Sequence, residues 1–495
     1  MNTQIKTILD QFKEQKILVI GDFILDIYLD GTCDRLAPES NIPVLDITTH
    51  KTCLGGSANV AANLHALGAH VCYMSVMGQD QSSKNGIELL QQKGIDSMCI
   101  HFSTSTPTLT KTRLYKDHQL LYRIDVGKEN CMEPEALESF LRDIEKAYFN
   151  CNAIYISDYN KGTINQRVID LLQKLQHRCK KTIAIDAKDY NRYKNLHPTI
   201  IKPNYQESLQ LLKEIQSEDR VQQAMQWGNR MRTLTQSQII AFTLDKDGLV
   251  LSKKGQSSFH YPVRETVAKN VSGAGDTFLA SFLLAYMSGA TEIDASRIAC
   301  SAACVSIQKN VTASCSISEL QFSLITDAGK VLVDTSFAPD FAHTLAQDKK
   351  VVFTNGCFDI FHSGHAHYLQ QARMLGDILV VGINTDDSVC RLKGPQRPIN
   401  TLEDRMEVLK GLSCVDYIIP FGQLGDDTPI NLIEAIQPSV YVKGEDYKNQ
   451  ELPEQSLLEA LGVEVKFLPY IQHQSTTKII ARVQKNENIQ LKKIS

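Results

Sequence analysis

The sequence predicts an α/β protein with two separate domains, each built on a mostly parallel β-sheet. Short apolar runs at residues 16–22, 71–76, 153–157 and 182–186 alternate with segments of helical periodicity such as 168–175. This alternation is typical of repeated strand–helix units. A chain of 495 residues is also too long for one ordinary hydrophobic core. The periodicity fades over residues 320–348 and a new strand pattern starts near residue 350.

We therefore expect a first domain over residues 1–320, a linker over 321–348 and a second domain over 349–495. Two alternating blocks of the first domain, 28–47 and 108–125, lack the continuous apolar character of central strands. We interpret them as a small antiparallel sheet that lies over the main doubly wound sheet as a lid.

The amino-acid composition limits the kinds of molecule and compartment that suit this protein. The net charge of −4 and the isoelectric point near 6.4 give no general affinity for nucleic acid or acidic membranes. The 13 cysteines include no C-x-x-C pair, which favours reduced thiols over a disulfide framework or a zinc site. No apolar run approaches the roughly 20 residues that span a bilayer, and the first residues show no export signal. We therefore expect a cytoplasmic protein without membrane insertion.

Residues 271–278, Val-Ser-Gly-Ala-Gly-Asp-Thr-Phe, form a small-residue turn that runs into an apolar helix. Glycines let the backbone fold closely round an anion, and a helix that starts here would direct its free N–H groups at that anion. Gly273, Ala274 and Gly275 are thus candidates for an anion hole. Asp276 lies beside the anion, where its carboxylate could take a proton from a hydroxyl that is being phosphorylated. The alternative is a glycine turn that caps a buried helix.

Polar residues also follow the other buried strands of the first domain. Asp22 and Asp26 come at the end of the first strand, where ligands bind in parallel sheets, although Asp22 could instead cap the turn. Gly55 and Gly56 open a helix that carries Asn59, whose amide suits recognition of a hydroxyl.

The predicted lid carries three cations, Lys111, Arg113 and Arg123. They would suit a substrate that already carries a phosphate, or they are ordinary solvated strand residues.

A Pro-Asn turn with a glutamate three residues later starts another helix. Asn204 and Glu207 could reach nucleotide phosphates and their Mg²⁺, directly or through water, or they could form only a capping box. Gly248 ends a predicted hairpin turn and either passes close to a nucleotide or serves the turn alone.

The order Gly-Asp, Gly-Gly-x-x-Asn, Asn-x-x-Glu and Gly-Ala-Gly-Asp resembles the ribokinase-like carbohydrate kinases across residues 10–318. The resemblance implies that Asp276 is the catalytic base beside the anion hole. It implies an ATP site at Lys188, Asn204, Tyr205, Gln206, Glu207 and Gly248. It implies a sugar site at Asp22, Asp26, Gly55, Gly56, Asn59, Lys111, Arg113, Arg123 and Asp158. Asn270 stands where this family often has aspartate, which puts a monovalent-cation site there in doubt.

A second chemical centre opens the second domain. An apolar strand ends in Thr-Asn-Gly at residues 354–356, and His362 and His365 flank a glycine at a helix start. Two histidines three residues apart could bind a metal, but no cysteine or carboxylate stands nearby at zinc spacing. Imidazoles at a helix N-terminus can instead donate hydrogen bonds to a phosphate whose charge grows during displacement.

This block resembles the nucleotidyltransferases that join a nucleoside monophosphate to a phosphorylated alcohol. The resemblance implies that His362, His365 and Lys393 stabilise an in-line displacement at the α-phosphorus. We also expect a basic loop at residues 391–397 and a helix cap at 475–477. The implied ATP site comprises Thr354, Asn355, Gly356, Phe358, Asp386, Arg391, Lys443, Ser475, Thr476 and Thr477.

Taken together, the two domains resemble the bifunctional heptose 7-phosphate kinase/heptose 1-phosphate adenylyltransferases of Gram-negative bacteria over nearly the whole chain. Further motifs that carry this resemblance are Arg-Leu-Ala-Pro-Glu at 35–39, Ser-Asp-Tyr at 157–159, Arg-Leu-Lys-Gly at 391–394 and Val-Lys-Gly at 442–444. Glu445 replaces the usual second glycine, which puts the backbone contacts of that turn in doubt.

The resemblance implies ATP-dependent phosphorylation of D-glycero-β-D-manno-heptose 7-phosphate at O1. A separate phosphatase would remove the 7-phosphate. Adenylyl transfer to heptose 1-phosphate would then give pyrophosphate and ADP-heptose for the lipopolysaccharide core. It also implies Mg²⁺ with ATP, no zinc or organic prosthetic group, and a homodimer formed through the lid.

Two alternatives stay open. The chain could join a kinase for another sugar to a cytidylyl- or adenylyltransferase for a polyol phosphate, because pocket shape rather than motif spacing selects the substrate. It could also be a nucleotide-binding scaffold without catalysis, although Asp276 and both histidines are intact.

Overall fold

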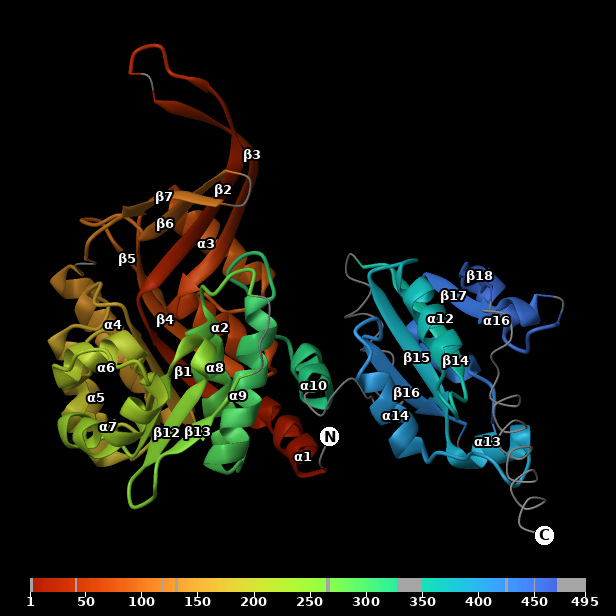
Figure 1. Cartoon of the computed structure of the whole chain (residues 1–495). Coiled ribbons are helices and arrows are strands. Elements are labelled where there is room, and N and C mark those ends of the chain that lie inside the picture. The colour runs from red at the N-terminus through yellow and green to blue at the C-terminus, as the bar shows by residue number, and fades with distance from the viewer. Residues whose placement is uncertain are drawn as a thin grey trace, which may run out of the picture. The chain divides into compact units, whose positions relative to one another are not determined.

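The computed structural model describes residues 3–40, 42–116, 119–129, 132–263, 268–326, 349–422, 426–448 and 450–469. The chain divides into two compact units, unit 1 (Met1–Leu320) and unit 2 (Gln321–Ser495), and the division falls within helix α10 (Ile317–Thr326). Each unit has its own mostly parallel sheet (Figure 1), so the predicted α/β class is confirmed.

The described part of unit 1 contains a nine-stranded sheet. Its spatial order is β13 (Phe259–Tyr261), β12 (Leu249–Lys253), β11 (Ile239–Thr243), β10 (Ile200–Ile201), β9 (Thr182–Ala187), β8 (Ala153–Asp158), β1 (Lys16–Gly21), β4 (His70–Gly78) and β5 (Ile100–Ser103). Neighbouring strands are parallel from β11 to β5, and β12 and β13 are added antiparallel. The central strand β1 is a continuous apolar run because both of its faces are covered by helices.

Helices cover both faces of this sheet (Figure 1). On one face lie α2 (Ser57–Ala66), α8 (Ala274–Met287) and α9 (Glu292–Ile307). On the other lie α4 (Pro134–Asn150), α5 (Gln166–Arg178), α6 (Tyr205–Leu212) and α7 (Arg220–Thr235), whose apolar side chains form one core with the sheet. The remaining helical segments are α1 (Thr3–Asp10), α3 (Gln81–Gln92) and the 3₁₀ turns η1 (Phe12–Glu14), η2 (Tyr190–Leu196) and η3 (Asp245–Asp247).

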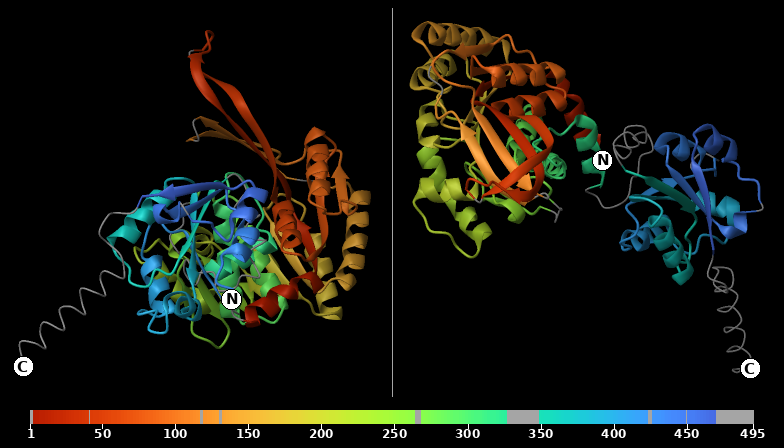
Figure 2. Two further views of the ribbon diagram at one scale, coloured as in Figure 1. Left: turned by 90° about the vertical axis from the view of Figure 1, so that its right-hand side faces the viewer. Right: turned by 90° about the horizontal axis from the view of Figure 1, so that it is seen from above.

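The predicted lid is present as a four-stranded sheet that extends away from the main sheet (Figure 2). Its order is β3 (Pro43–Gly56), β2 (Phe23–Leu36), β6 (Thr110–Lys116) and β7 (Gln119–Val126). The expectation of a purely antiparallel lid was wrong, because β2 and β6 pair in parallel. Both strands leave the carboxyl edge of the main sheet, β2 after β1 and β6 after β5, and therefore run in the same direction.

Unit 2 has a five-stranded parallel sheet in its described part. The order is β16 (Tyr417–Phe421), β15 (Ile378–Asn384), β14 (Val351–Gly356), β17 (Val440–Gly444) and β18 (Glu464–Leu468). The helical segments are α12 (Ser363–Arg373), α13 (Asp386–Lys393), α14 (Leu402–Lys410), α15 (Ile430–Ile436), η5 (Glu445–Tyr447) and α16 (Gln455–Ala460). A separate apolar core joins the sheet to α12 and α14.

We predict that Leu283→Ala in α8 lowers the free energy of unfolding of unit 1 by about 2–5 kcal/mol, because Leu283 is fully buried and its loss leaves a cavity. Trp227 is the only tryptophan of the sequence and is buried in unit 1, so its fluorescence during urea unfolding reports on this unit. Leu234→Ala is the control, since Leu234 is 38% exposed and should lose only about 0.5 kcal/mol. Equal losses would contradict the packing described for α8.

Two candidate active sites

In unit 1, the carboxyl ends of β8, β9 and β10 and the N-terminus of α8 meet around one cavity. The cavity has a volume of about 140 Å³. It is lined by Asp158, Tyr159, Asp186, Ala187, Lys188, Lys202, Asn204, Glu207, Gly273, Gly275 and Asp276. Residues far apart in the sequence therefore form one charged pocket at the strand ends, where parallel sheets bind ligands.

Asp276 lies in the first turn of α8 and is only 4% exposed. Asn59 Nδ2 donates a hydrogen bond of 2.9 Å to Asp276 Oδ2, and the Tyr159 hydroxyl lies 3.4 Å from Oδ1. Burial raises the pKa of the Asp276 carboxyl to about 7, and the negative charge of Asp186 acts in the same direction, whereas Asn59 and Lys202 lower it. A carboxylate with a pKa near neutrality suits a general base.

Gly273 and Gly275 of the turn at the start of α8 line the cavity, whereas the predicted anion-hole residue Ala274 is outside the lining and its N–H donates to the Val271 carbonyl oxygen at 3.3 Å. Gly273 caps the helix with φ +84°, and a Cβ placed there would lie 2.6 Å from Asn59 Nδ2. A Cβ at Gly275 would lie 2.9 Å from Lys202 Nζ. Glycine thus leaves room for an anion to approach both the helix N-terminus and a lysine.

Lys202, Asp186 and Tyr159 are site residues that sequence reasoning did not assign. Lys202 is 5% exposed, and its Nζ lies 3.1 Å from Asp186 Oδ2. Burial by itself lowers the pKa of Lys202, but the negative charges of Asp186 and Glu207 raise it above its usual value, so the lysine stays charged. The available signal was a lysine directly after a buried strand, at the edge where ligands bind.

The lid contributes a second group of charges at the cavity. Lys111 Nζ lies 5.0 Å from the centre of the Tyr159 ring and Lys188 Nζ lies 5.8 Å from it. Arg113 donates to Asp26 Oδ1 at 2.7 Å, and both side chains are largely buried. The structure thus brings Lys111 close to the pocket, with Arg113 and Asp26 paired on the neighbouring lid strands.

Two predicted sugar ligands have other partners. Asp22 is fully buried and accepts hydrogen bonds from the backbone N–H groups of Tyr159, Lys161 and Thr163, which supports the turn-capping alternative. Asp158 lines the cavity, but it pairs with Arg192 and accepts hydrogen bonds from Tyr193 and from the backbone of Asn160. Both carboxylates fix the loop after β8. Asp22 is completely buried and outside the cavity lining, which corrects its assignment to the sugar, whereas Asp158 stays in the wall of the cavity.

Arg123 does not reach the pocket either. It pairs with Asp125 on β7, and both side chains are exposed, because β7 is the edge strand of the lid. Gly55 and Gly56 end β3 next to α2, and a Cβ at Gly55 would lie 2.4 Å from Asp26 Oδ2.

Of the predicted ATP ligands in unit 1, Asn204 and Glu207 line the cavity and also form the capping box of α6. Glu207 Oε1 accepts from Lys188 Nζ at 2.5 Å.

Two further assignments to ATP, Tyr205 and Gln206, need correction, and for Gly248 the structure supports the turn alternative. The Tyr205 side chain is buried against Trp227, and Gln206 is exposed outside the cavity lining. Gly248 has φ +87° and a Cβ there would lie 2.3 Å from the Tyr261 carbonyl oxygen, so the hairpin itself requires glycine.

In unit 2, His362 and His365 lie at the start of α12 with their rings stacked 3.9 Å apart. In the described part of the chain, both Nδ1 atoms are buried without a hydrogen-bond partner. Burial lowers the pKa of His362; burial and then the neighbouring His362 lower the pKa of His365 to about 4. The rings of Phe358 and Phe361 pack against His365. Two neutral imidazoles with free ring nitrogens can donate hydrogen bonds to a phosphate.

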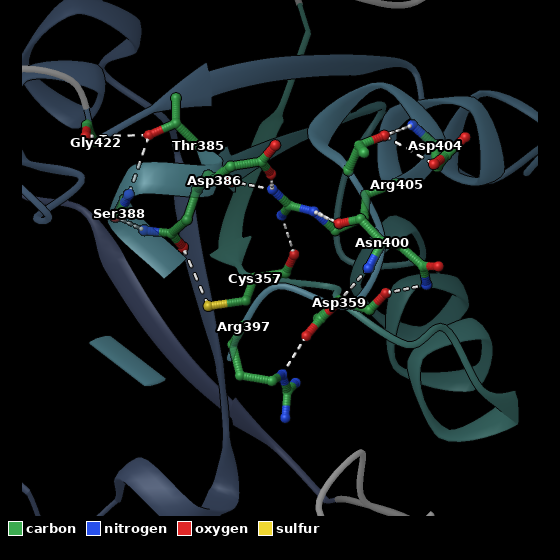
Figure 3. A network of polar contacts seen from close by, with 12 residues as sticks. Cys357, Asp359, Thr385, Asp386, Ser388, Arg397, Asn400, Asp404, Arg405 and Gly422 are labelled. Atoms are coloured by element: carbon green, nitrogen blue, oxygen red, sulfur yellow. Dashed lines mark hydrogen bonds and ion pairs between the residues drawn. The ribbon is translucent and has the colours of Figure 1, made fainter. Parts of the chain in front are cut away.

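A buried arginine holds the strand ends of this site together (Figure 3). The Arg405 guanidinium donates to the backbone oxygens of Cys357, Asn384 and Asn400 and to Asp386 Oδ1. These groups belong to the ends of β14 and β15, the start of α13 and the segment before α14. Arg405 therefore connects four segments of one edge and its guanidinium is completely buried.

Asp359 fixes the neighbouring segment in the same way (Figure 3). It accepts from the backbone N–H groups of Ile399 and Asn400 and pairs with Arg397. These two networks were not foreseen from the sequence, because the residues that they join are up to about fifty positions apart.

The predicted basic loop at residues 391–397 was partly wrong. Arg391 and Lys393 lie in the last turn of α13, which Thr385 caps by accepting from the Ser388 N–H. Arg391 is taken up by an ion pair with Asp427 at 2.6 Å. Lys393 is exposed. Burial raises the pKa of the Cys357 thiol at the end of β14, and the positive charge of Lys393 acts against this rise, so Lys393 lies at the edge of the site.

Among the remaining predicted nucleotide ligands, Lys443 is 9% exposed and its Nζ lies 5.0 Å from the centre of the Tyr447 ring and 3.7 Å from Glu454 Oε1. Asn355 Oδ1 accepts from the Tyr441 hydroxyl at 2.8 Å, next to Gly356 at the end of β14.

The Thr354 hydroxyl is completely buried and bonds the Val442 carbonyl oxygen at 2.9 Å, which corrects its assignment to ATP. Ser475, Thr476 and Thr477 lie outside the described residues. None of the helices in the described ranges is both long and apolar enough to cross a membrane. No group of three or more His, Cys, Asp or Glu side chains in those ranges is arranged to hold a metal ion.

The two sites define a sugar kinase joined to a nucleotidyltransferase, and comparisons with known proteins agree. The pfkB family of carbohydrate kinases matches residues 14–319, and the cytidylyltransferase-like family matches residues 353–482. Phosphofructokinase-2 from Escherichia coli has a TM-score of 0.52 at 14% identity, over 63% of this chain and 98% of its own. Ribokinase from Arabidopsis thaliana has a TM-score of 0.50 at 20% identity, over 63% and 98%. At such identities these structures show the fold alone.

Full-length relatives identify the family. The bifunctional protein HldE of Helicobacter pylori (strain J99) is 36% identical, over 96% of this chain and 100% of its own. Those of Campylobacter concisus and Haemophilus influenzae (strain PittEE) are 36% and 35% identical, over 96% of this chain and 99% and 98% of theirs. The chain belongs to the HldE family of bifunctional proteins. This confirms the function predicted from the sequence, that of a bifunctional heptose kinase and adenylyltransferase.

We predict that Gly273→Ala reduces the kinase kcat/KM by about 100-fold or more, because the added methyl group would displace Asn59 and close the anion hole. Gly289→Ala is the matched control: Gly289 has nearly the same φ of +87°, but its Cβ would meet nothing within 4 Å. Steady-state phosphorylation rates of the two variants separate backbone strain from steric loss of the site. Similar losses in both variants would argue against the anion hole.

Proposed function

We propose that unit 1 transfers the γ-phosphoryl group of ATP to O1 of D-glycero-β-D-manno-heptose 7-phosphate, with Asp276 as the general base. The observation that carries this proposal is the buried Asp276 carboxylate, with its pKa of about 7, at the N-terminus of α8 beside Lys202. Asp276 takes the proton of the anomeric hydroxyl as that oxygen attacks phosphorus. The N–H groups of Gly273 and Gly275 and the Lys202 ammonium face the charge that develops on the transferred group.

The other charges of the pocket fit the remaining parts of the two substrates. Lys188 lies near the nucleotide phosphates, while Lys111 and Arg113 of the lid lie towards the 7-phosphate of the sugar. The residues also fit a magnesium ion carried by ATP, because the Asp186 and Glu207 carboxylates line the same cavity and carboxylate oxygens are ligands that Mg²⁺ takes. In the described structure these carboxylates pair with Lys202 and Lys188. These carboxylates would hold the ion, Glu207 through water, and the bound ion would withdraw charge from the phosphates.

For unit 2 we propose adenylyl transfer from ATP to heptose 1-phosphate. The acceptor phosphate is already ionised, so the site needs no base. The paired imidazoles of His362 and His365, with Lys393 at the site edge, would stabilise an in-line displacement that releases pyrophosphate. Lys443 and Asn355 lie at the neighbouring strand ends for the nucleotide.

The two reactions require a third enzyme between them and a place where ATP is available. Because unit 1 adds a second phosphate and unit 2 uses a sugar with only the 1-phosphate, we propose that a separate heptose bisphosphate phosphatase acts between them. We place the protein in the cytoplasm, in the supply of ADP-heptose for lipopolysaccharide. The domain limits that we propose are 1–320 for the kinase, 321–348 for the linker and 349–495 for the adenylyltransferase.

We predict that Asp276→Asn abolishes phosphorylation and leaves adenylyl transfer from heptose 1-phosphate intact, and that His365→Ala does the reverse. The physical reason is that each side chain belongs to a different compact unit with its own core. Mass spectrometry of the products from ATP with heptose 7-phosphate or heptose 1-phosphate measures both activities.

The wild-type enzyme and a panel of other sugar phosphates serve as controls for that experiment. Turnover of heptose 7-phosphate no better than that of the other sugars would refute the proposed substrate. Loss of both activities in either variant would refute the independence of the two sites.

We also propose a homodimer formed through the lid. All residues of the edge strand β7 are exposed, and the alternate positions Tyr122, Ile124 and Val126 form an apolar row on one of its faces. An exposed edge strand with such a row is a template for pairing with another chain. A second copy of the lid provides a self-complementary partner, as twofold symmetry requires.

We expect light scattering at micromolar concentration to give about twice the chain mass of 55.4 kDa. Tyr122→Glu should shift the protein to a monomer, because a charge would be buried in the apolar row. Ile215→Glu is the control, since Ile215 is 90% exposed in unit 1 and outside the lid. A monomeric wild-type protein, or an unchanged mass for Tyr122→Glu, would rule out this interface.

A further inference from the structure

Asp276 is connected by a chain of hydrogen bonds to the segment between α9 and α10. The backbone N–H of Cys315 donates to Asn63 Oδ1 at 3.2 Å. Asn63 Nδ2 donates to Asn59 Oδ1 at 3.3 Å and to the Asn59 backbone oxygen at 2.9 Å. Asn59 Nδ2 then donates to Asp276 Oδ2 at 2.9 Å. Asn63 is completely buried and is not part of the cavity lining, so it touches neither substrate.

The backbone of Cys315 sets the direction of this chain. A backbone N–H can only donate, so the atom of Asn63 that faces it must be the side-chain oxygen. The amide nitrogen of Asn63 then faces Asn59 and requires the oxygen of Asn59 on that side. As a result, the nitrogen of Asn59 faces the carboxylate. Each amide has only one orientation that satisfies its neighbours, and a flipped Asn59 would bring its oxygen against Asp276.

The segment that carries the Cys315 N–H, the first donor in this series of hydrogen bonds, is itself held in place. In the same segment, Thr312 Oγ1 lies 2.7 Å from the Tyr28 hydroxyl of β2, and the Thr312 N–H donates to that hydroxyl at 3.3 Å. The Cys315 residue is completely buried. The donor that orients Asn63 is therefore held in place by the Thr312–Tyr28 contact in its own segment and by its burial.

We propose that Asn63 is a positioning residue for the kinase reaction: it holds Asn59 in the one orientation that donates a hydrogen bond to the base, Asp276. This inference rests on the proposed role of Asp276 and deepens it. The donation occupies Oδ2 and stabilises the ionised carboxylate. Oδ1 has a longer contact of 3.4 Å with the Tyr159 hydroxyl, and it is the oxygen that accepts the proton of the sugar hydroxyl. Without Asn63, the Asn59 amide has two orientations, and the carboxylate loses a permanent donor.

Other ionisable groups also face Asp276 and set the background for a pH measurement. They are Asp186 of β9, Lys202 after β10, Asp26 of β2, and Tyr155 and Tyr159 at the end of β8. None of them contacts Asn63 through the bonds described above, so a substitution at Asn63 leaves them in place. The Asn59 hydrogen bond is among the influences that lower the pKa of Asp276. Its loss therefore raises that pKa.

The sign of the expected change follows from the chemistry of a base. Asp276 acts only when it is deprotonated, so activity falls as the pH drops through its pKa, and a higher pKa moves this acidic limb to higher pH. We expect Asn63→Leu and Asn63→Ala to move the acidic limb of the kinase kcat/KM upward by about one pH unit. Activity should fall about 10-fold at pH 6 and change little at pH 9, where the carboxylate is ionised in both enzymes.

The experiment is a kcat/KM profile between pH 5.5 and 9 for phosphorylation of heptose 7-phosphate by the full-length chain. The substrates titrate identically for every enzyme variant, so a difference between profiles belongs to the protein. Ser281→Ala is the control, because Ser281 is also completely buried and donates to the Thr277 carbonyl oxygen at 2.7 Å, outside the chain of amides. It should leave the limb in place. Trp227 fluorescence shows whether unit 1 is folded. If the bulkier leucine variant does not fold, the Asn63→Ala variant provides the test.

An upward shift of the acidic limb supports the inference. A uniform loss at every pH would overturn it by showing a purely structural role, and so would an unchanged profile. If the wild-type chain turned over no sugar phosphate at all, the proposed function would fail, and this result is distinguishable from an active enzyme whose Asn63 variants keep the original limb.

Discussion

The direction of the strands in a parallel sheet constrains both units of this protein. Parallel strands end at one edge, and the helices that follow begin there with unpaired N–H groups. That edge therefore collects backbone donors and the polar residues that end each apolar run. In unit 1 it carries the turn before α8, and in unit 2 it carries the start of α12. Among the described residues, each unit thus has a strand edge that is suited to phosphate.

Burial then decides which of the charged groups at these edges are reactive. Asp22 and Asp158 are buried with hydrogen bonds from backbone or with a paired arginine, and they serve to hold a loop. Burial raises the pKa of Asp22 to about 6, but three backbone N–H donors occupy its carboxylate. Burial raises the pKa of Asp276 to about 7, and its carboxylate lines the cavity with side-chain neighbours only, the Asn59 amide and the Tyr159 hydroxyl. The buried strand edge of unit 1 therefore contains both structural carboxylates and a candidate base. What distinguishes them is how many hydrogen-bond and ion-pair partners the protein provides for each carboxylate.

At the corresponding strand edge, unit 2 has a buried arginine and two neutral imidazole rings in place of carboxylates. Arg405 has no exposed guanidinium surface and connects four segments, so it supports the site without offering its charge to a ligand. Both paired histidines have a buried ring nitrogen without a hydrogen-bond partner among the described residues, and burial lowers the pKa of both rings, which favours their neutral form. The family membership of the whole chain and the separate cores of the two units agree with a protein in which one chain carries out two phosphate chemistries.

The sequence by itself determined the α/β class, the lid and the identity of the two motifs, because these depend on local patterns: apolar runs, glycine turns and residues a few positions apart. It also led to Asp276, His362 and His365, which lie at helix starts that the sequence marks. Only the tertiary structure decided the partners of each polar group. It placed Lys202 and Tyr159 at the pocket. It also paired Arg391 with Asp427 and packed Tyr205 against Trp227. The physical reason is that satisfaction of a buried charge depends on neighbours brought from distant positions, which spacing along the chain does not encode.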